Sequence, residues 1–391
     1  MLNGLISNFL SLKKLLPLFG LVLLLFLQGC SGSKIAIDIK RDDAPFDLCG
    51  NDPERQYDIS ADPIDSLVSL FDLDGYGSSL ASAPLVYAGY IFCPDLGGRL
   101  YCYSLATHKK AGMLKYKGSI AASPVFVKDL IAVPVILSGS TSTDLIYYDF
   151  MSGKEMVRRT IKGYVINDLL KCADGIVAVA ENGIVEKFSF KGEPIFHSEL
   201  KAFVHGSPAL LEDKIYIPSD DGSVYVLNSS TGASIEVFKT GEIRLYGLSV
   251  RNGKVFIPAE NGIVLSMDAH SGKIVWRQKL DGAVRNSISS DSGTAYIGTS
   301  KGMVYALSLD SGTVLWECRS GGVVSCPLLV TKFNILTGNQ NGEFLVMNKK
   351  SGEIISKYKF ENRVRTIPAL YGEWIVVGYD YGEYRVFKRN K

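Results

Sequence analysis

Short apolar runs recur along the second half of this chain at a regular interval of 40 residues. Each run is rich in β-branched and aromatic residues, so each predicts a β-strand. The runs cover residues 214–218, 254–258, 294–298, 334–338 and 374–378. Repetition at this interval is typical of small supersecondary units that stack on one another to bury a shared core.

Tight turns divide each repeat into four short strands. A first turn follows each run, and pairs such as Asp221-Gly222 and Asn261-Gly262 favour hairpins because the turn needs positive φ. A second turn, such as Ser271-Gly272, comes ten residues after the first glycine. The same unit continues towards the N-terminus with less regularity. The first turns fall near residues 98, 143, 183, 222, 262, 302, 342 and 382, which makes eight units.

Four antiparallel strands in each 40 residues predict an all-β fold, an eight-bladed β-propeller of four-stranded antiparallel blades, over residues 56–391. The eighth unit ends near residues 386–388 and leaves no room for a fourth strand. We therefore expect residues 56–60 to pair with the C-terminal strand and close the ring, because closure removes an exposed sheet edge. The alternative is an open solenoid.

The N-terminal residues predict an export signal. Lys13 and Lys14 precede an apolar run over residues 15–27, which is shorter than the roughly 20 residues that a membrane span needs. The run leads into Leu27-Gln28-Gly29-Cys30, which resembles a bacterial lipobox. The alternative is an ordinary anchor helix with a chance cysteine.

The lipobox resemblance implies a lipoprotein signal peptide over residues 1–29 and lipid attachment at Cys30. Two or three acyl chains on one residue would make membrane attachment stable. Because Ser31 follows the cysteine, the resemblance also implies sorting to the outer membrane. Residues 30–55 contain turn formers and no helical periodicity, so we expect a lipidated N-terminus and tether there.

The balance of basic and acidic residues argues against a nucleic-acid partner. The chain has 42 basic and 40 acidic residues, and the expected signal contains two of the lysines and no acid. The remainder is therefore balanced, whereas a dedicated nucleic-acid-binding domain is strongly basic. The 47% hydrophobic content fits a globular protein with a large core and excludes a disordered chain.

The repeat itself resembles that of pyrroloquinoline-quinone type propellers. That repeat combines Val-Tyr-x-Leu with Ser/Thr-Gly-x-x-x-Trp, and here Trp276 and Trp316 stand four residues after Gly272 and Gly312. The Trp-Asp dipeptide of WD-repeat propellers is absent. Together with the lipobox and the short tether, the eight repeats resemble the BamB family of outer-membrane assembly factors.

This resemblance implies a non-enzymatic scaffold without a cofactor, anchored by lipid at the periplasmic face of the outer membrane. The implied partners are outer-membrane barrel-assembly proteins. The family's partner-binding loops would fall at residues 202–205 and 244–246, but the sequence departs from the family pattern there. The partner contacts therefore cannot be transferred residue by residue.

Two other function classes stay open. A quinone-dependent dehydrogenase has a similar propeller, but two adjacent cysteines commonly face the quinone in that family, and no two cysteines are adjacent here. The patterns His-Glu-x-x-His, Gly-x-Ser-x-Gly and Cys-x-x-Cys are also absent, so the sequence indicates no catalytic residue and no metal site. The third class is an envelope binding protein unrelated to barrel assembly.

Basic residues recur where the chain begins four of the innermost strands, whereas the equivalent places in three other units hold Ala121, Ile166 and Ser325. The basic residues are His205, Arg244, Arg285 and Arg365. Equivalent positions in a ring converge around its axis, so we expect a basic patch at one channel mouth that binds carboxylates of a partner or another anion. The alternative is that each arginine pairs with a local acid such as Glu242 or Glu361.

Two cysteines of the first unit, Cys93 and Cys102, are equidistant from the Gly97-Gly98 turn. An exported protein can form disulfides, and a bridge across this hairpin is one prediction. The other is that both cysteines are buried thiols, which behave as small hydrophobic side chains.

Overall fold

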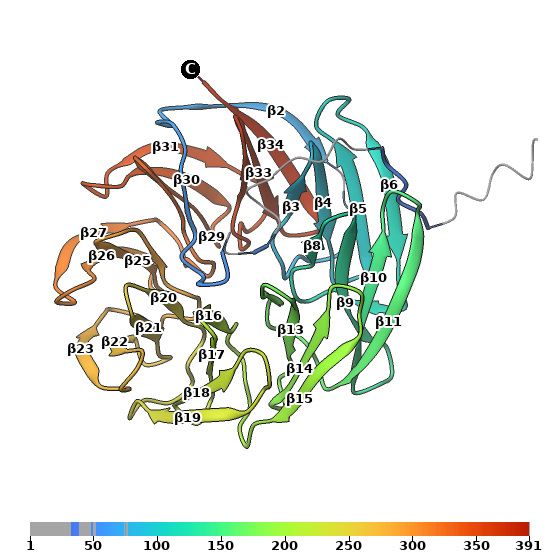
Figure 1. The fold of residues 1–391 in the computed structure, drawn as a ribbon. Coiled ribbons are helices and arrows are strands. Elements are labelled where there is room, and N and C mark those ends of the chain that lie inside the picture. The colour runs from blue at the N-terminus through green and yellow to red at the C-terminus, as the bar shows by residue number, and fades with distance from the viewer. Residues whose placement is uncertain (1–32, 39–47, 50–51, 74, 76, 391) are drawn as a thin grey trace, which may run out of the picture. The chain divides into compact units, whose positions relative to one another are not determined.

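Eight antiparallel sheets stand side by side around a central axis in the computed structural model (Figure 1). The chain divides into the units Met1–Lys34 and Ile35–Lys391, and the second unit contains the eight sheets. The structure describes all residues except 1–32, 39–47, 50–51, 74, 76 and 391. Cys30 and the expected signal therefore lie outside the described residues. The described residues contain no helix long and apolar enough to cross a membrane.

The first four blades follow one another along the chain. Blade 1 contains β3 (Leu85–Tyr87), β4 (Tyr90–Pro94), β5 (Arg99–Ser104) and β6 (Lys110–Lys115). Blade 2 contains β7 (Gly118–Ser119), β8 (Val125–Val127), β9 (Leu130–Leu137), β10 (Ser142–Asp149) and β11 (Lys154–Lys162). Blade 3 contains β12 (Leu170–Lys171), β13 (Gly175–Val179), β14 (Ile184–Ser189) and β15 (Pro194–Glu199). Blade 4 contains β16 (Ala209–Leu211), β17 (Lys214–Pro218), β18 (Ser223–Asn228) and β19 (Ser234–Lys239).

The other four blades include two strands from the N-terminal part of the chain. Blade 5 contains β20 (Ser249–Arg251), β21 (Lys254–Pro258), β22 (Ile263–Asp268) and β23 (Ile274–Lys279). Blade 6 contains β24 (Ser289–Ser290), β25 (Thr294–Gly298), β26 (Met303–Ser308) and β27 (Val314–Arg319). Blade 7 contains β1 (Asp58–Ile59), β28 (Leu329–Thr331), β29 (Asn334–Asn339), β30 (Glu343–Asn348) and β31 (Ile354–Lys359). Blade 8 contains β32 (Ala369–Tyr371), β33 (Trp374–Tyr379), β34 (Glu383–Arg389) and β2 (Leu67–Leu73). The predicted eight-bladed β-propeller is confirmed.

An N-terminal strand closes the ring, but the predicted segment was wrong. Strand β2 pairs antiparallel with β34, with Leu67 opposite Arg389 and Leu73 opposite Tyr384. The predicted residues 56–60 contain β1, which instead pairs in parallel with β28 of blade 7. The physical reason is length, because β34 is seven residues long and β2 matches it, whereas β1 has only two residues.

The core lies between neighbouring blades rather than at one centre. One hydrophobic cluster, for example, joins Phe92 of blade 1 to Phe126 of blade 2, and the centroids of these two rings are 4.8 Å apart. Each sheet buries both faces against its neighbours, as stacked repeats must. The ring is therefore stabilised by eight similar interfaces.

Described parts of the expected tether pack on this ring. The backbone N–H of Ile37 donates to the Phe150 carbonyl at 2.9 Å. The Tyr148 hydroxyl donates to the Ile35 carbonyl at 2.9 Å and accepts from the Ile35 N–H at 3.0 Å. Ile35 and Ile37 are buried.

The candidate bridge between Cys93 and Cys102 is not formed. Both are free, buried thiols. Cys102 lies opposite Phe92, and Cys93 lies opposite Tyr101. Successive residues of a strand point to opposite faces, so the two sulfur atoms belong to different interblade clusters. Equal spacing from the turn was misleading because the hairpin is centred one half-residue away from that midpoint.

Candidate interaction site

All four predicted site residues lie at the same step of the repeat, just before an innermost strand. His205 precedes β16, Arg244 precedes β20, Arg285 precedes β24 and Arg365 precedes β32. This step places all four at the same end of the ring, together with the hairpin turns between the second and third strands of each blade. We call the joining loops and these turns the charged loop face.

Backbone hydrogen bonds hold the charged loop face together. In blade 5 the N–H of Glu260, which lies in the hairpin turn, donates to the Arg244 carbonyl of the joining loop at 3.1 Å. In blade 4 the N–H of Asp220 donates to the Phe203 carbonyl at 2.9 Å. Because blades 6, 7 and 8 repeat this bond, the loops are fixed parts of the fold rather than independent segments.

Glu260 joins two of the predicted arginines. One of its carboxylate oxygens lies 3.2 Å from Arg244 Nη1, and the other lies 3.0 Å from Arg285 Nη2. Partial burial opposes ionisation, but hydrogen bonds from Arg244 and Tyr246 and the charge of Arg285 hold the pKa of Glu260 below its ordinary value. The group therefore carries two positive charges and one negative charge at neutral pH.

A small cavity adjoins this group. It has a volume of about 210 Å³ and is lined by His205, Asp220, Arg244 and Tyr246. His205 Nδ1 lies 2.9 Å from Asp220 Oδ2. The Arg244 backbone has a φ of 52°, in the left-handed region that non-glycine residues seldom adopt. Strained positions of this kind cluster at functional sites, so the cavity is a candidate binding site within the charged loop face.

Arg365 is separate from the other three residues because blade 7 stands between blades 6 and 8. Its Nη2 lies 2.6 Å from Asp380 Oδ1, and Arg363 Nε lies 3.7 Å from the other oxygen of the same carboxylate. The structure thus gathers His205, Arg244 and Arg285 but leaves Arg365 in a second ion-pair group.

Each predicted arginine has an acidic partner, as the alternative interpretation expected, but the acids are different. Glu260 and Asp380 take this role. Glu242 pairs with Arg277 at 2.6 Å, and Glu361 lies 3.6 Å from Arg385. Exposed ion pairs contribute only about 0–1 kcal/mol each. A carboxylate of a partner could therefore replace Glu260 at little cost.

Sequence reasoning missed the apolar part of this face. Phe203 and Ile243 lie in the joining loops before blades 4 and 5, and they are 62% and 66% exposed. It also missed the acids, although Asp220, Glu260 and Asp380 stand at multiples of 40 residues from one another. Aligning the acidic residues on the same 40-residue period as the basic residues would have indicated that the two sets form ion pairs.

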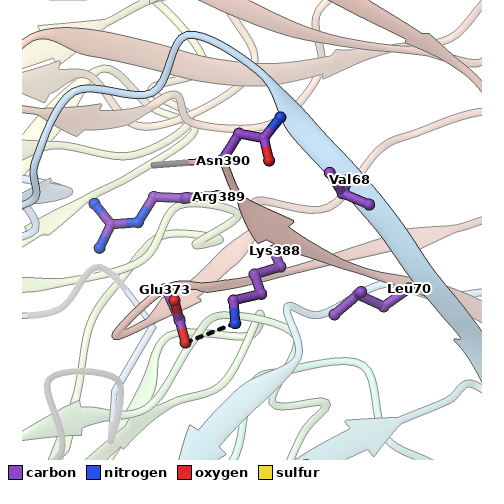
Figure 2. Close-up of a pocket in the computed structure, with 6 residues that line it drawn as sticks. All are labelled: Val68, Leu70, Glu373, Lys388, Arg389 and Asn390. Carbon is purple, nitrogen blue, oxygen red and sulfur yellow. Dashed lines mark ion pairs between the residues drawn. The ribbon is translucent and has the colours of Figure 1, made fainter.

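A second hollow lies at the opposite end of blade 8. It has a volume of about 400 Å³ beside the closing strand, and Val68 and Leu70 of β2 line one side (Figure 2). Lys388 Nζ lies 3.1 Å from Glu373 Oε1 within it. It contains none of the predicted site residues. Across the described residues, no group of three or more His, Cys, Asp or Glu side chains could hold a metal ion.

Residues 238–331 match a family model described as "Outer membrane protein assembly factor BamB". The matched segment contains Arg244, Glu260 and Arg285. The chain resembles the BamB family. No curated protein sequence matches the chain.

Solved structures share the propeller. BamB from Moraxella catarrhalis superposes with a TM-score of 0.69 at 13% sequence identity, and the match covers 83% of this chain and 100% of that chain. A quinohemoprotein alcohol dehydrogenase from Pseudomonas putida HK5 gives 0.72 at 11% identity, with 88% and 80% covered. A europium-containing methanol dehydrogenase gives 0.72 at 10% identity, with 89% and 98% covered. At these identities the likeness to BamB and to the dehydrogenases concerns the fold.

Proposed function

We propose that this chain is a non-enzymatic scaffold of the bacterial outer membrane, anchored by lipid at Cys30, that binds barrel-assembly proteins. The observation that carries the proposal is the BamB-family match over residues 238–331. That segment includes the joining loops before blades 5 and 6, and these loops carry Arg244 and Arg285.

The charged loop face supports binding through two kinds of contact. Phe203 and Ile243 offer exposed apolar side chains on loops that the ring holds in place. Arg244 and Arg285 lie close by and share one carboxylate, so they can accept a partner's acid in its place. Apolar anchors contribute most to affinity, whereas charges set orientation and association rate.

Affinity purification from detergent-solubilised outer membranes tests the proposal. We expect the unmodified chain to recover barrel-assembly proteins and the double variant Arg244→Gln/Arg285→Gln to recover far less. Lys273→Gln/Lys350→Gln is the matched control, because both lysines are exposed in turns between the third and fourth strands of blades 5 and 7, at the opposite end of the ring. Equal recovery by the double variant would show that this face is not the binding surface.

Recovery of other envelope proteins without any barrel-assembly protein would favour an unrelated binding role.

The dehydrogenase folds favour a second candidate, a quinone-dependent enzyme. To separate it from a scaffold, the purified chain can be incubated with pyrroloquinoline quinone and calcium, desalted, and assayed by absorbance and by dye-linked alcohol oxidation. Retained quinone together with turnover would contradict the scaffold proposal.

A further inference from the structure

Residues 52–59, which we call the inner arm, cross the innermost strands of four successive blades. One backbone N–H from each of blades 4, 5, 6 and 7 donates to a carbonyl of the arm. These bonds run from Leu210 to Pro53 at 2.8 Å, and from Val250 to Glu54, Ser290 to Gln56 and Val330 to Tyr57 at 2.9 Å each. The donors of blades 4, 5 and 6 lie five or six residues after His205, Arg244 and Arg285 in the chain. The arm therefore binds away from the charged loop face.

Arg55 is the most deeply held residue of the arm, with an exposed fraction of 0%. Its Nη2 donates to the Asp168 and Leu169 carbonyls at 3.0 and 2.9 Å, and its Nε donates to the Pro208 carbonyl at 3.2 Å. The Asp168 carboxylate lies 3.8 Å from its Nη1. A planar guanidinium with five donors suits this ring of carbonyl oxygens, whereas a lysine ammonium does not.

The arm alternates between buried and half-buried residues. Arg55, Tyr57 and Ile59 are buried, and the residues between them are half-buried. The backbone is left-handed at Arg55 and Tyr57, with φ of 61° and 56°. Such conformations persist only where surrounding contacts enforce them. The ring therefore supplies both the hydrogen bonds and the shape that the arm needs.

We propose that the innermost strands of blades 4–7 form a peptide-binding site whose resident ligand is the inner arm of the same chain. Strand β2 supplies the fourth strand of blade 8, so ring closure does not require the arm. Backbone hydrogen bonds provide affinity, as in other sites that bind extended peptides. The Arg55 pocket provides specificity for an arginine followed two residues later by an aromatic side chain.

Cleaving the folded chain tests this proposal. Asp62 and Pro63 are exposed and lie between β1 and β2, so a protease recognition sequence can be inserted between them in the full-length chain. After cleavage we expect the N-terminal fragment to stay with the ring through size-exclusion chromatography. In the cleaved Arg55→Ala variant it should dissociate at least about 10-fold faster, because hydrogen bonds of a buried charge are lost. Glu54→Gln is the control, since among the described residues the Glu54 carboxylate accepts a hydrogen bond only from Gln56 of the arm itself.

A second measurement, by peptide competition, uses only the cleaved, unmodified chain and so does not require a variant of the ring to fold. A labelled synthetic peptide of residues 48–60 should displace the fragment from the cleaved, unmodified chain, and the same peptide with Arg55→Ala should not. Loss of the unmodified fragment during chromatography, without added peptide and from a ring that stays folded by circular dichroism, would overturn the proposal. So would unfolding of the ring on release, or equal competition by both peptides.

Discussion

At the residue scale, glycine and tryptophan connect neighbouring blades. Trp276 of blade 5 donates through Nε1 to the Leu309 carbonyl of blade 6 at 2.9 Å and packs on Gly312. Trp316 and Gly352 repeat the contact between blades 6 and 7. The Ser/Thr-Gly-x-x-x-Trp pattern therefore has a physical reason, because the tryptophan ring of one blade occupies the space that a side chain would fill at the glycine of the next blade.

Substituting Gly312 with alanine tests this contact. Gly312 has a φ of 72°, and an added Cβ would lie 2.6 Å from the Trp276 ring. We expect Gly312→Ala to lower the free energy of unfolding by about 1–3 kcal/mol, measured by urea denaturation. Gly293→Ala is the control, since a Cβ there has nothing within 4 Å, and it should change stability little. Equal effects of the two would refute this account of the repeat.

At the scale of elements, two buried leucines anchor the closing strand β2, one at each end of the strand. Leu67 and Leu73 are 7% and 3% exposed, whereas Leu70 is 39% exposed. Arg385 of β34 adds a bidentate ion pair to Asp72, with nitrogen–oxygen distances of 2.7 and 3.1 Å. Both features join the two ends of the chain in a single sheet.

A buried and an exposed position of β2 should respond differently to the same substitution. Leu73→Ala removes a buried side chain and should cost about 2–4 kcal/mol of unfolding free energy. Leu70→Ala, at an exposed position, should cost less than about 1 kcal/mol. Chemical denaturation of both variants measures the difference. Similar values would mean that β2 contributes little to closing the ring.

At the scale of the whole molecule, the ring is one cooperative body although its core is divided. Blade 8 contains residues from both ends of the chain, and the inner arm crosses four other blades. Opening blade 8 would expose the interfaces that β33 and β34 make with their neighbours. The free energy of local opening at β2 should therefore equal the free energy of opening the whole of blade 8.

Hydrogen exchange can measure this coupling. We expect the hydrogen-bonded amides of β2 to exchange with the same free energy of opening as those of β34, since the two strands form one unit. Mass spectrometry of the native chain over a denaturant series gives both values. Exchange of β2 at the rate of a frayed terminus would show that the ring closes only weakly.

The sequence predicted the fold far better than the site. The 40-residue period and its Asn-Gly and Asp-Gly turns are local signals, so the blades and their number followed from them. The closing segment did not, because pairing between segments far apart in the chain leaves no local signal, and Leu67–Leu73 rather than residues 56–60 pairs with the C-terminal strand. The sequence left open whether Cys93 and Cys102 form a bridge or are buried thiols. The structure shows buried thiols, because a shift of register turns the two side chains to opposite faces.

What the sequence determined by itself was the repeat, because strand and turn propensities act between near neighbours. It also indicated the basic positions His205, Arg244, Arg285 and Arg365, because one period carries them. The tertiary structure alone decided which charges meet: Glu260 serves two arginines from different blades, and Arg55 reaches Asp168 across more than a hundred residues. Such contacts depend on how neighbouring repeats stack and on where the inner arm crosses the ring, and the local pattern specifies neither of these.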